Sequence, residues 1–188
     1  MRKLVLIMHS SFDGFVAGPC GEMDWLTVNE SMFDFVHELT QQADTALYGR
    51  KTYEIMDNYW PSAGEMPNAS KHDKDHSTWY KTVTKLVVSK TLAGETIPGT
   101  IIISNDPVAE IKSYKNTPGK NILMLGSPSL ISLLTNENLI DEYFLFVNAV
   151  LIGKGIPLFN NISEKINFTL MESRPFPGNV VCLHYMKN

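Results

Sequence analysis

Cysteine and long apolar runs are scarce in this chain. Its 188 residues include two cysteines, Cys20 and Cys182, which are too few for a disulfide framework and fit a reducing compartment. No apolar run approaches the ~20 residues that a membrane helix needs. The run at 4–8 ends at His9 with no small-residue cleavage site after it, unlike a secretory signal peptide. We therefore expect a cytoplasmic protein without a membrane segment.

Basic charge is also scarce. The 16 Lys and Arg residues are outnumbered by 20 Asp and Glu residues, the formal net charge is -4, and no block rich in Lys and Arg occurs. A nucleic-acid surface needs such a block, so nucleic acid is not an expected partner. The length and the ordinary apolar content predict one compact domain over residues 1–188.

Apolar, β-rich runs alternate with helical patterns in the first two thirds of the chain. The runs predict largely buried strands at 3–8, 45–48, 85–88, 100–103 and 121–125. The helical patterns lie at 30–42, 51–57, 70–83, 108–115 and 128–135, and 62–77 reads as a surface loop leading into a helix. This alternation favours a wound α/β sheet with helices on both faces.

The last third of the chain has a different pattern. Three strand-like segments, 141–151, 166–174 and 179–186, follow one another with no helix between them, and a turn is predicted at 175–178. Strands joined in this way pair antiparallel. Apolar residues in this tail also predict a two-fold interface and hence a homodimer; they are Tyr143, Phe144, Phe146 and Val147.

The strongest functional signal lies where the second predicted strand ends. Gly49 breaks the apolar run, and a cationic helix start with a hydroxyl group follows it, formed by Arg50, Lys51 and Thr52. A glycine permits close backbone approach, and the unpaired amides and positive dipole of a helix start attract anions. This corner predicts a phosphate site.

Two further segments follow predicted strands in the same way. Ser89, Lys90 and Thr91 offer one cation and two hydroxyl groups, which suits the 2′-phosphate of a nicotinamide dinucleotide. Gly126 and Ser127 open a helix whose amides suit a second phosphate. Each segment alone is an ordinary strand-to-helix turn, but ligands bind at the carboxyl ends of strands in open α/β sheets, so their common position favours one shared site.

A fourth segment, 10–18, leaves the first strand through a turn that contains Asp13 and Gly14. Its small residues permit a flat ring to approach the same edge of the sheet. The alternative is a plain Asp-Gly turn between two strands.

In combination, these segments resemble the dihydrofolate-reductase-like superfamily. More closely, they resemble stand-alone bacterial proteins related to the reductase domain of the bifunctional riboflavin-biosynthesis enzyme. The resemblance covers nearly the whole chain in order. It implies a three-layer α/β sandwich, with a mixed, mostly parallel sheet, helices on both faces and an antiparallel C-terminal strand group. The matching segments are 11–17, 48–54, 88–92, the turn at Gly126, and 139–159.

The resemblance also implies NADPH as cofactor. The adenosine phosphates would be held by Gly49, Arg50, Lys51, Thr52, Ser89, Lys90 and Thr91; the pyrophosphate by Gly126, Ser127, Ser129 and Leu130; and the nicotinamide side would be lined by Val16 and Ala17. One departure is Pro128, which has no amide hydrogen to donate and so weakens the expected pyrophosphate site.

Hydride transfer to an imine-like or carbonyl-like carbon needs a proton for the neighbouring atom. Trp25 and Glu30 match the spacing of the tryptophan and substrate-binding carboxylate in dihydrofolate reductases, and Asp34 lies one helical turn after Glu30. We therefore predict Glu30 and Asp34 as catalytic and Asp13 and Trp25 as substrate-binding. Glu30 can also be explained as a first-turn carboxylate that the helix dipole stabilises.

Two classes of function remain open at this point. One is an NADPH-dependent reductase of a small heterocyclic substrate, similar to 5-amino-6-(5-phosphoribosylamino)uracil reductase, with dihydrofolate reductase as an enzymatic alternative. The other is a non-catalytic nucleotide-binding or flavin-binding protein. The zinc deaminase motifs of the bifunctional enzyme are absent, because Cys20 has no second cysteine after it at the required spacing. We expect no metal site.

Overall fold

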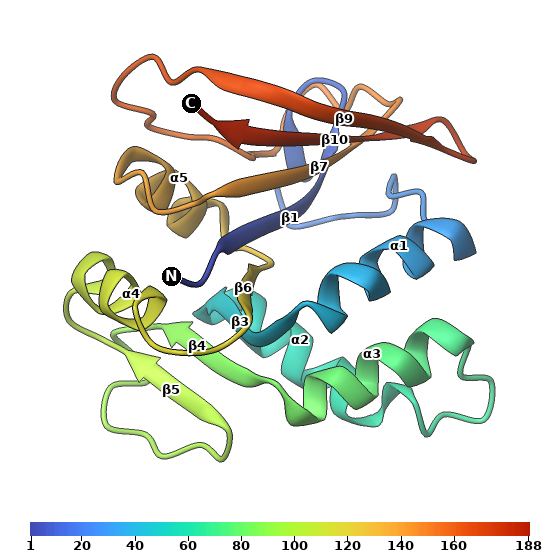
Figure 1. The fold of residues 1–188 in the computed structure, drawn as a ribbon. Helices are drawn as coiled ribbons and strands as arrows, with labels where there is room; N and C mark the ends of the chain where they lie inside the picture. The colour runs from blue at the N-terminus through green and yellow to red at the C-terminus, as the bar shows by residue number, and fades with distance from the viewer.

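A computed structural model describes all residues from 1 to 188 and has a three-layer α/β architecture (Figure 1). In Figure 1, α4 and α5 lie to the left of an eight-stranded sheet and α1 and α3 to the right. The helices are α1 Glu30–Gln41, α2 Arg50–Ala63, α3 Lys71–Thr82, α4 Pro107–Lys115 and α5 Pro128–Asn136. The strands of this sheet are β1 Leu4–Ser11, β3 Ala43–Gly49, β4 Thr84–Val88, β5 Thr100–Ile103, β6 Asn121–Met124, β7 Glu142–Asn148, β9 Phe168–Phe176 and β10 Val180–Lys187.

The sheet is mixed but mostly parallel. Its strand order is β5-β4-β3-β6-β1-β7-β10-β9, and the first six strands in this order run parallel to one another. β10 pairs antiparallel with both β7 and β9, which forms the C-terminal strand group. The carboxyl ends of the six parallel strands therefore share one edge of the sheet, and their amino ends share the other.

Two apolar clusters cover the two faces of the sheet. Along β1, Val5 and Ile7 face the cluster under α1, α2 and α3, whereas Leu4 and Leu6 face the cluster under α4 and α5. This division follows from the alternation of side chains along a strand. All four residues are at most 4% exposed, so β1 is a central strand buried on both faces.

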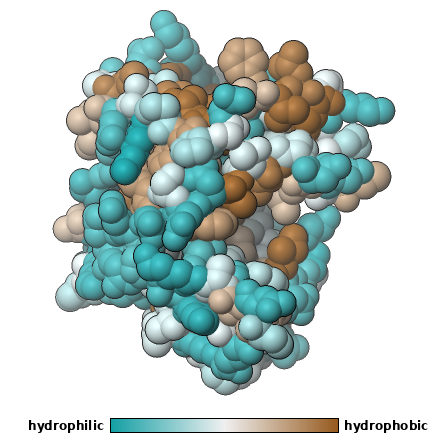
Figure 2. All heavy atoms as spheres, turned by 90° about the vertical axis from the view of Figure 1, so that its right-hand side faces the viewer, coloured by the Kyte–Doolittle hydropathy of each residue, from teal (hydrophilic) through white to brown (hydrophobic).

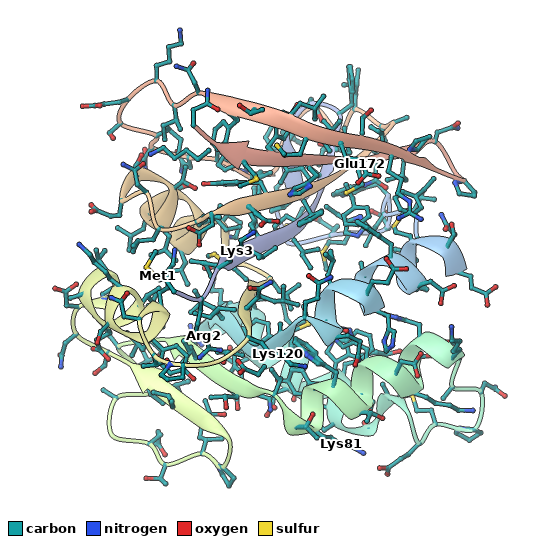
Figure 3. All side chains as sticks on the ribbon, viewed as in Figure 1. Met1, Arg2, Lys3, Lys81, Lys120 and Glu172 are labelled. Carbon is teal, nitrogen blue, oxygen red and sulfur yellow. The ribbon has the colours of Figure 1, made fainter.

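The amino edge holds buried cations with complete sets of partners. Arg2, which is 6% exposed, pairs with Asp44 and donates to the carbonyl of Lys120 (2.7 Å), and Figure 3 shows Arg2 near Lys120. Lys115, which is 3% exposed, donates to Asp141 and to the carbonyl of Leu139, both at 2.6 Å. These contacts join the starts of β1, β3, β6 and β7 and explain how charged side chains are tolerated there.

Most of the predicted elements are confirmed, but several bounds differ. Helix α2 runs to Ala63 and includes Pro61, so the surface loop predicted from residue 62 begins after this helix. The strand predicted at 141–151 ends at Asn148. β5 was predicted as largely buried, but it is the edge strand, and Ile101 is 45% exposed.

The structure also adds a small element that the sequence did not predict. β2 (Phe15–Ala17) and β8 (Ile156–Pro157) form a two-stranded antiparallel sheet across the loops that follow β1 and β7. Gly155 is required there, because a Cβ atom at this position would lie 2.1 Å from the carbonyl oxygen of Ala17.

Three of the four predicted interface residues of the tail need a correction, whereas Val147 is partly exposed. Tyr143, Phe144 and Phe146 are at most 5% exposed, because α1, α5 and the neighbouring strands cover β7. They belong to the core and are not free to contact a second copy. The exposed apolar residues of the tail lie instead on the edge strand β9, where Leu170 and Met171 are 49% and 53% exposed.

The two cysteines are unpaired and differ in accessibility. Cys20 is exposed in the loop after β2, whereas Cys182 on β10 is buried. Burial raises the pKa of the Cys182 thiol to about 12. None of the helices combines the length and the apolarity that crossing a lipid bilayer requires.

Candidate functional site

The carboxyl edge of the sheet brings the predicted phosphate segments together. Gly49, Ser89 and Gly126 stand at or just after the ends of β3, β4 and β6, which are neighbours in the sheet, and β1 is the next neighbour of β6. The segments are far apart in the sequence, but the parallel pairing places them side by side. The common position inferred from the sequence is therefore confirmed.

Gly49 and Gly126 are in direct contact at the centre of this edge. The amide of Gly49 donates to the carbonyl of Gly126 (3.1 Å), and the peptide bond from Gly126 to Ser127 is cis. A Cβ atom at position 49 would lie 2.3 Å from the Ser127 hydroxyl oxygen. At position 126, where φ is +112°, it would lie 3.0 Å from the Thr52 hydroxyl oxygen. Both glycines are therefore required by the close approach of the two chain segments.

Two of the five helices, α2 and α5, lack side-chain caps at this edge. Gly49 and Ser127 are the N-cap residues of α2 and α5, and neither makes a side-chain hydrogen bond to its helix. In contrast, Asn29, Ser70 and Asp106 cap α1, α3 and α4 with side-chain oxygens. The first-turn amides of α2 and α5 are thus left for another acceptor, and an anion is the acceptor that a helix start favours.

The basic residues around these helix starts are not equivalent. Arg50 is tied to Glu54 by an ion pair of 2.6 Å within α2, so part of its charge is neutralised. Lys51 and Lys90 are exposed and have no acidic partner within 4.0 Å. These two lysines are the cations free to pair with a bound anion.

Several hydroxyl groups of the predicted site already contact groups of their own turns. The Ser89 oxygen is directed into its own turn, where it accepts from the amide of Leu92 and contacts the Thr91 oxygen, both at 3.1 Å. Ser127 and Ser129 have their oxygens 3.2 Å apart at the start of α5. Leu130 is 5% exposed and belongs to the core, so its backbone amide is the group that it can offer.

The turn after β1 is held in place by Asp13. Its carboxylate accepts hydrogen bonds from the Ser11 hydroxyl (2.6 Å) and from the amides of Gly153 (2.8 Å) and Ile152 (3.3 Å). These bonds, that from Ser11 above all, hold the pKa of Asp13 below its usual value. Asp13 therefore joins the loops that follow β1 and β7.

Residues 2–182 match the RibD C-terminal domain family. The chain belongs to this family. As a RibD C-terminal domain, it is 31% identical over 191 residues to the uncharacterized protein YyaP of Bacillus subtilis (strain 168), and the match covers 100% of this chain and 96% of YyaP.

Solved structures agree with this family on the fold. The putative riboflavin biosynthesis protein from Shewanella sp. PV-4 has a TM-score of 0.74 at 21% identity, covering 100% of this chain and 99% of that one. The bifunctional deaminase and 5-amino-6-(5-phosphoribosylamino)uracil reductase of Thermotoga maritima has a TM-score of 0.70 at 16% identity, covering 100% and 57%. Dihydrofolate reductase of Enterococcus faecalis, solved with NADP(H), has a TM-score of 0.66 at 16% identity, covering 99% and 96%. The fold is thus the dihydrofolate-reductase-like one expected from the sequence.

The two predicted acids of this RibD C-terminal domain line a cavity that includes none of the predicted phosphate-binding residues. Glu30 and Asp34 are exposed on α1 and line a cavity of about 330 Å³ that opens between α1 and α3. Asp34 pairs there with Lys71 (2.7 Å), whose hydrogen bond holds the pKa of Asp34 below its usual value. The side of the molecule that carries α3 is mainly hydrophilic in its lower part (Figure 2). Proton donation by either acid stays a prediction.

The residues predicted beside the nicotinamide and the substrate are more enclosed. Val16 and Ala17 are 8% and 7% exposed in β2, and Val16 packs in the same cluster as Leu130 of α5. Trp25 lies in the loop between β2 and α1, and its indole nitrogen is buried without a hydrogen-bond partner. Most buried polar atoms have a hydrogen-bond partner, so this nitrogen is an exception.

Sequence reasoning missed His9 on β1. Its Nδ1 atom is also buried without a partner, although the residue lies near the carboxyl end of a central strand. The sequence does contain a signal for it, because His9 follows the otherwise apolar run Leu4–Met8. A polar ring in such a strand has to be explained by a partner or by a ligand.

Proposed function

We propose that this RibD C-terminal domain is an NADPH-dependent reductase of a small heterocyclic substrate. The observation that carries the proposal is the meeting of two uncapped helix starts, those of α2 and α5, at the contact between Gly49 and Gly126. A pair of anion sites separated by two glycines suits a dinucleotide, because its phosphates require close backbone approach.

The residues present fit this cofactor in charge as well as in shape. The amides at 50–52 and the side chains of Lys51 and Lys90 would hold the adenosine phosphates, and Lys90 would pair with the 2′-phosphate. The amides of Ser129 and Leu130 would hold the pyrophosphate, although Pro128 contributes no donor. When bound, the cofactor supplies a hydride to a carbon of the substrate.

The protein's own part in such a reaction is to orient the substrate and to provide a proton for the atom next to the reduced carbon. Trp25 and the loops joined by Asp13 would enclose the substrate, and Glu30, Asp34 or a positioned water would be the proton source. The Thermotoga relative is named as a 5-amino-6-(5-phosphoribosylamino)uracil reductase. The substrate proposed for this chain is similar to that uracil derivative.

The proposal includes a cytoplasmic homodimer. Two unpaired cysteines are consistent with a reducing compartment, and NADPH is the usual reductant there. The exposed Leu170 and Met171 on the edge strand β9 provide an apolar strand for a two-fold contact. Sedimentation at micromolar concentration is expected to give twice the chain mass of 21.1 kDa, and the single mass would contradict the dimer.

The test of the function begins with binding. NADPH fluorescence should change on addition of the protein and saturate, and NADH should bind at least ~10-fold more weakly because it lacks the 2′-phosphate. Oxidation of NADPH at 340 nm is then followed with 5-amino-6-(5-phosphoribosylamino)uracil, 7,8-dihydropterin and dihydrofolate. Binding without oxidation would favour a non-catalytic nucleotide-binding protein, and absence of NADPH binding would overturn the proposal.

A further inference from the structure

Two loops from distant parts of the chain lie side by side beyond the carboxyl edge of the sheet. The Phe12 amide donates to the carbonyl of Val150 (2.8 Å), and the Leu158 amide donates to the carbonyl of Gly14 (2.9 Å). Next to these bonds, β2 pairs antiparallel with β8. Residues 150–158, which we call the strap, therefore follow the chain that leaves β1 through its turn and into β2.

Asp13 adds side-chain hydrogen bonds to this pairing. Both of its carboxylate oxygens accept from the chain itself: Oδ1 from the Ser11 hydroxyl (2.6 Å) and the Ile152 amide (3.3 Å), and Oδ2 from the Gly153 amide (2.8 Å). The Ser11 oxygen accepts in turn from the Phe15 amide (3.0 Å), and Ser11 is 1% exposed. Asp13 is thus connected to the strap on one side and to the buried end of β1 on the other.

The strap has a backbone shape that suits a carboxylate. Gly153 has a φ of +74°, a conformation that favours glycine, and the amides of Ile152 and Gly153 both donate to Asp13. Consecutive backbone amides arranged in this way form a concavity that binds an anion. Hydrogen bonds from amides to an ionised carboxylate are also stronger than those between neutral groups. The carboxylate of Asp13 is therefore a matched partner for the strap, which an apolar side chain could not replace.

The strap supports the backbone of β2. A Cβ atom at Gly155 would lie 2.1 Å from the carbonyl oxygen of Ala17, so the two backbones are in direct contact. Val16 of β2 and Leu158 of the strap belong to the apolar cluster that includes Leu130 of α5. The place of β2 is therefore determined by the strap and by the core next to α5, whose uncapped start is part of the proposed dinucleotide site.

We propose that Asp13 is a positioning residue, which clasps the strap to the turn after β1 and thereby fixes β2 relative to the two uncapped helix starts. This inference rests on the proposed function, in which Val16 and Ala17 line the nicotinamide ring of NADPH. Hydride transfer requires aligned reacting atoms, and a displacement of about 1 Å can lower its rate ~100-fold. Asp13 acts through β2 in this role, whereas the sequence predicted that it contacts the substrate.

The test uses two probes that differ in the nicotinamide ring. NADPH contains the ring, and its emission reports the surroundings of the ring, whereas adenosine 2′,5′-bisphosphate carries phosphates without the ring. The variants are Asp13→Ala, which removes both oxygens, and Asp13→Asn, which keeps one. Glu164→Gln is the control, because it removes an exposed carboxylate with no ion-pair partner from the loop after β8.

In ligand-free Asp13→Ala, amide hydrogen exchange across 150–158 should be at least ~10-fold faster than in the wild type, because the strap is no longer clasped. At saturation, the emission of bound NADPH should move toward that of free NADPH. The affinity for adenosine 2′,5′-bisphosphate, measured by calorimetry, should stay within about twofold. Asp13→Asn should show the same changes to a smaller extent, and it decides the test if Asp13→Ala does not fold. Glu164→Gln should show none of them.

Wild-type exchange rates in both Asp13 variants would overturn the inference. Wild-type emission of bound NADPH in both would also overturn it, since Asp13 would then have a purely structural role. An equal loss of affinity for both probes would do the same, because the effect would not be confined to the ring. If the wild type binds both probes and the emission of NADPH does not change, the inference fails and the cofactor part of the proposed function stands. If the wild type binds neither probe, the proposed function itself is overturned.

Discussion

The two edges of the parallel sheet differ in how their polar groups are satisfied. At the amino edge, the buried side chains of Arg2 and Lys115 each have a carboxylate partner and further oxygen acceptors. At the carboxyl edge, Lys51 and Lys90 have no acidic partner, the starts of α2 and α5 have no side-chain cap, and His9 has no hydrogen bond.

This difference separates stability from function. A buried charge with partners holds strands together, and removal of one partner leaves the other charge buried and uncompensated. The groups without partners on the opposite edge do not stabilise the isolated fold, and the exposed ones, Lys51 and Lys90, can pair with a ligand. Substitutions at the amino edge should therefore change stability, and those at the carboxyl edge should change binding.

The largest effect is expected at Asp141. Asp141→Ala removes the carboxylate partner of Lys115, whose side chain is 4% exposed, so the free energy of unfolding should fall by about 3–5 kcal/mol. NADPH affinity should not change in the folded variant. Urea denaturation measures the first quantity and fluorescence the second. Lys3→Ala, which breaks an exposed ion pair with Glu142, is the control and should cause a much smaller change.

Gly49→Ala should change NADPH affinity, in contrast to the stability effect expected at Asp141. The new Cβ atom would lie 2.3 Å from the Ser127 oxygen, so the two helix starts must separate, and NADPH affinity should fall by about 100-fold. Adding Ser127→Gly removes the clashing side chain and should restore most of the affinity, as measured by fluorescence titration. If the double variant binds as poorly as the single one, contact between these segments is not what organises the site.

His76 provides an intermediate case, because it is an unsatisfied group away from both edges. Burial lowers its pKa to about 3 in the folded protein, against about 6.5 in the unfolded chain. The unfolded state therefore binds the proton more readily, and stability falls as the pH decreases below about 6.5. Between pH 6 and pH 4, the loss should be about 1–3 kcal/mol smaller in His76→Leu than in the wild type. Urea denaturation across this range would show equal losses if the ring were accessible to protons in the fold.

The smallest effect is expected from charge reversal at Lys90. Lys90→Glu should weaken NADPH binding by about 10-fold at low salt and leave NADH binding unchanged, because only NADPH has a 2′-phosphate. Lys112→Glu, at an exposed position in the last turn of α4, makes the same change in net charge and should have no effect. Equal weakening of the binding of both dinucleotides by Lys90→Glu would mean that this lysine contacts a part of the cofactor other than the 2′-phosphate.

The fold and the meeting of the predicted phosphate segments at one edge were predictable because local patterns determine them. Apolar runs and helical periodicity give the order of strands and helices, and parallel strands then bring Gly49 and Gly126 to one edge. Asn29, Asp106 and Ser127 are typical capping residues at predicted helix starts, and the first two do cap their helices with side-chain oxygens. Ser127 is the N-cap residue of α5 but makes no side-chain hydrogen bond to it.

Other features depend on contacts between distant segments. Nothing near Asp13 in the sequence indicates that its carboxylate binds amides about 140 residues away, or that β2 pairs with β8. The orientation of the Ser89 hydroxyl depends on its turn, and the ion pair of Asp34 depends on α3. The buried, unpartnered Nδ1 atom of His9 was not predicted, because a histidine in a strand gives no information on whether its nitrogens find partners.

One of the two thiols is exposed and the other is buried, so a single position can be labelled selectively. Thiolate is the species that alkylating reagents modify, and the shielded sulfur on β10 with its pKa of about 12 carries almost none of it at neutral pH. A maleimide fluorophore should therefore attach at Cys20 alone, five residues before Trp25 and without mutagenesis. Its emission would then follow the conformation of that loop in real time as dinucleotides and heterocycles are added.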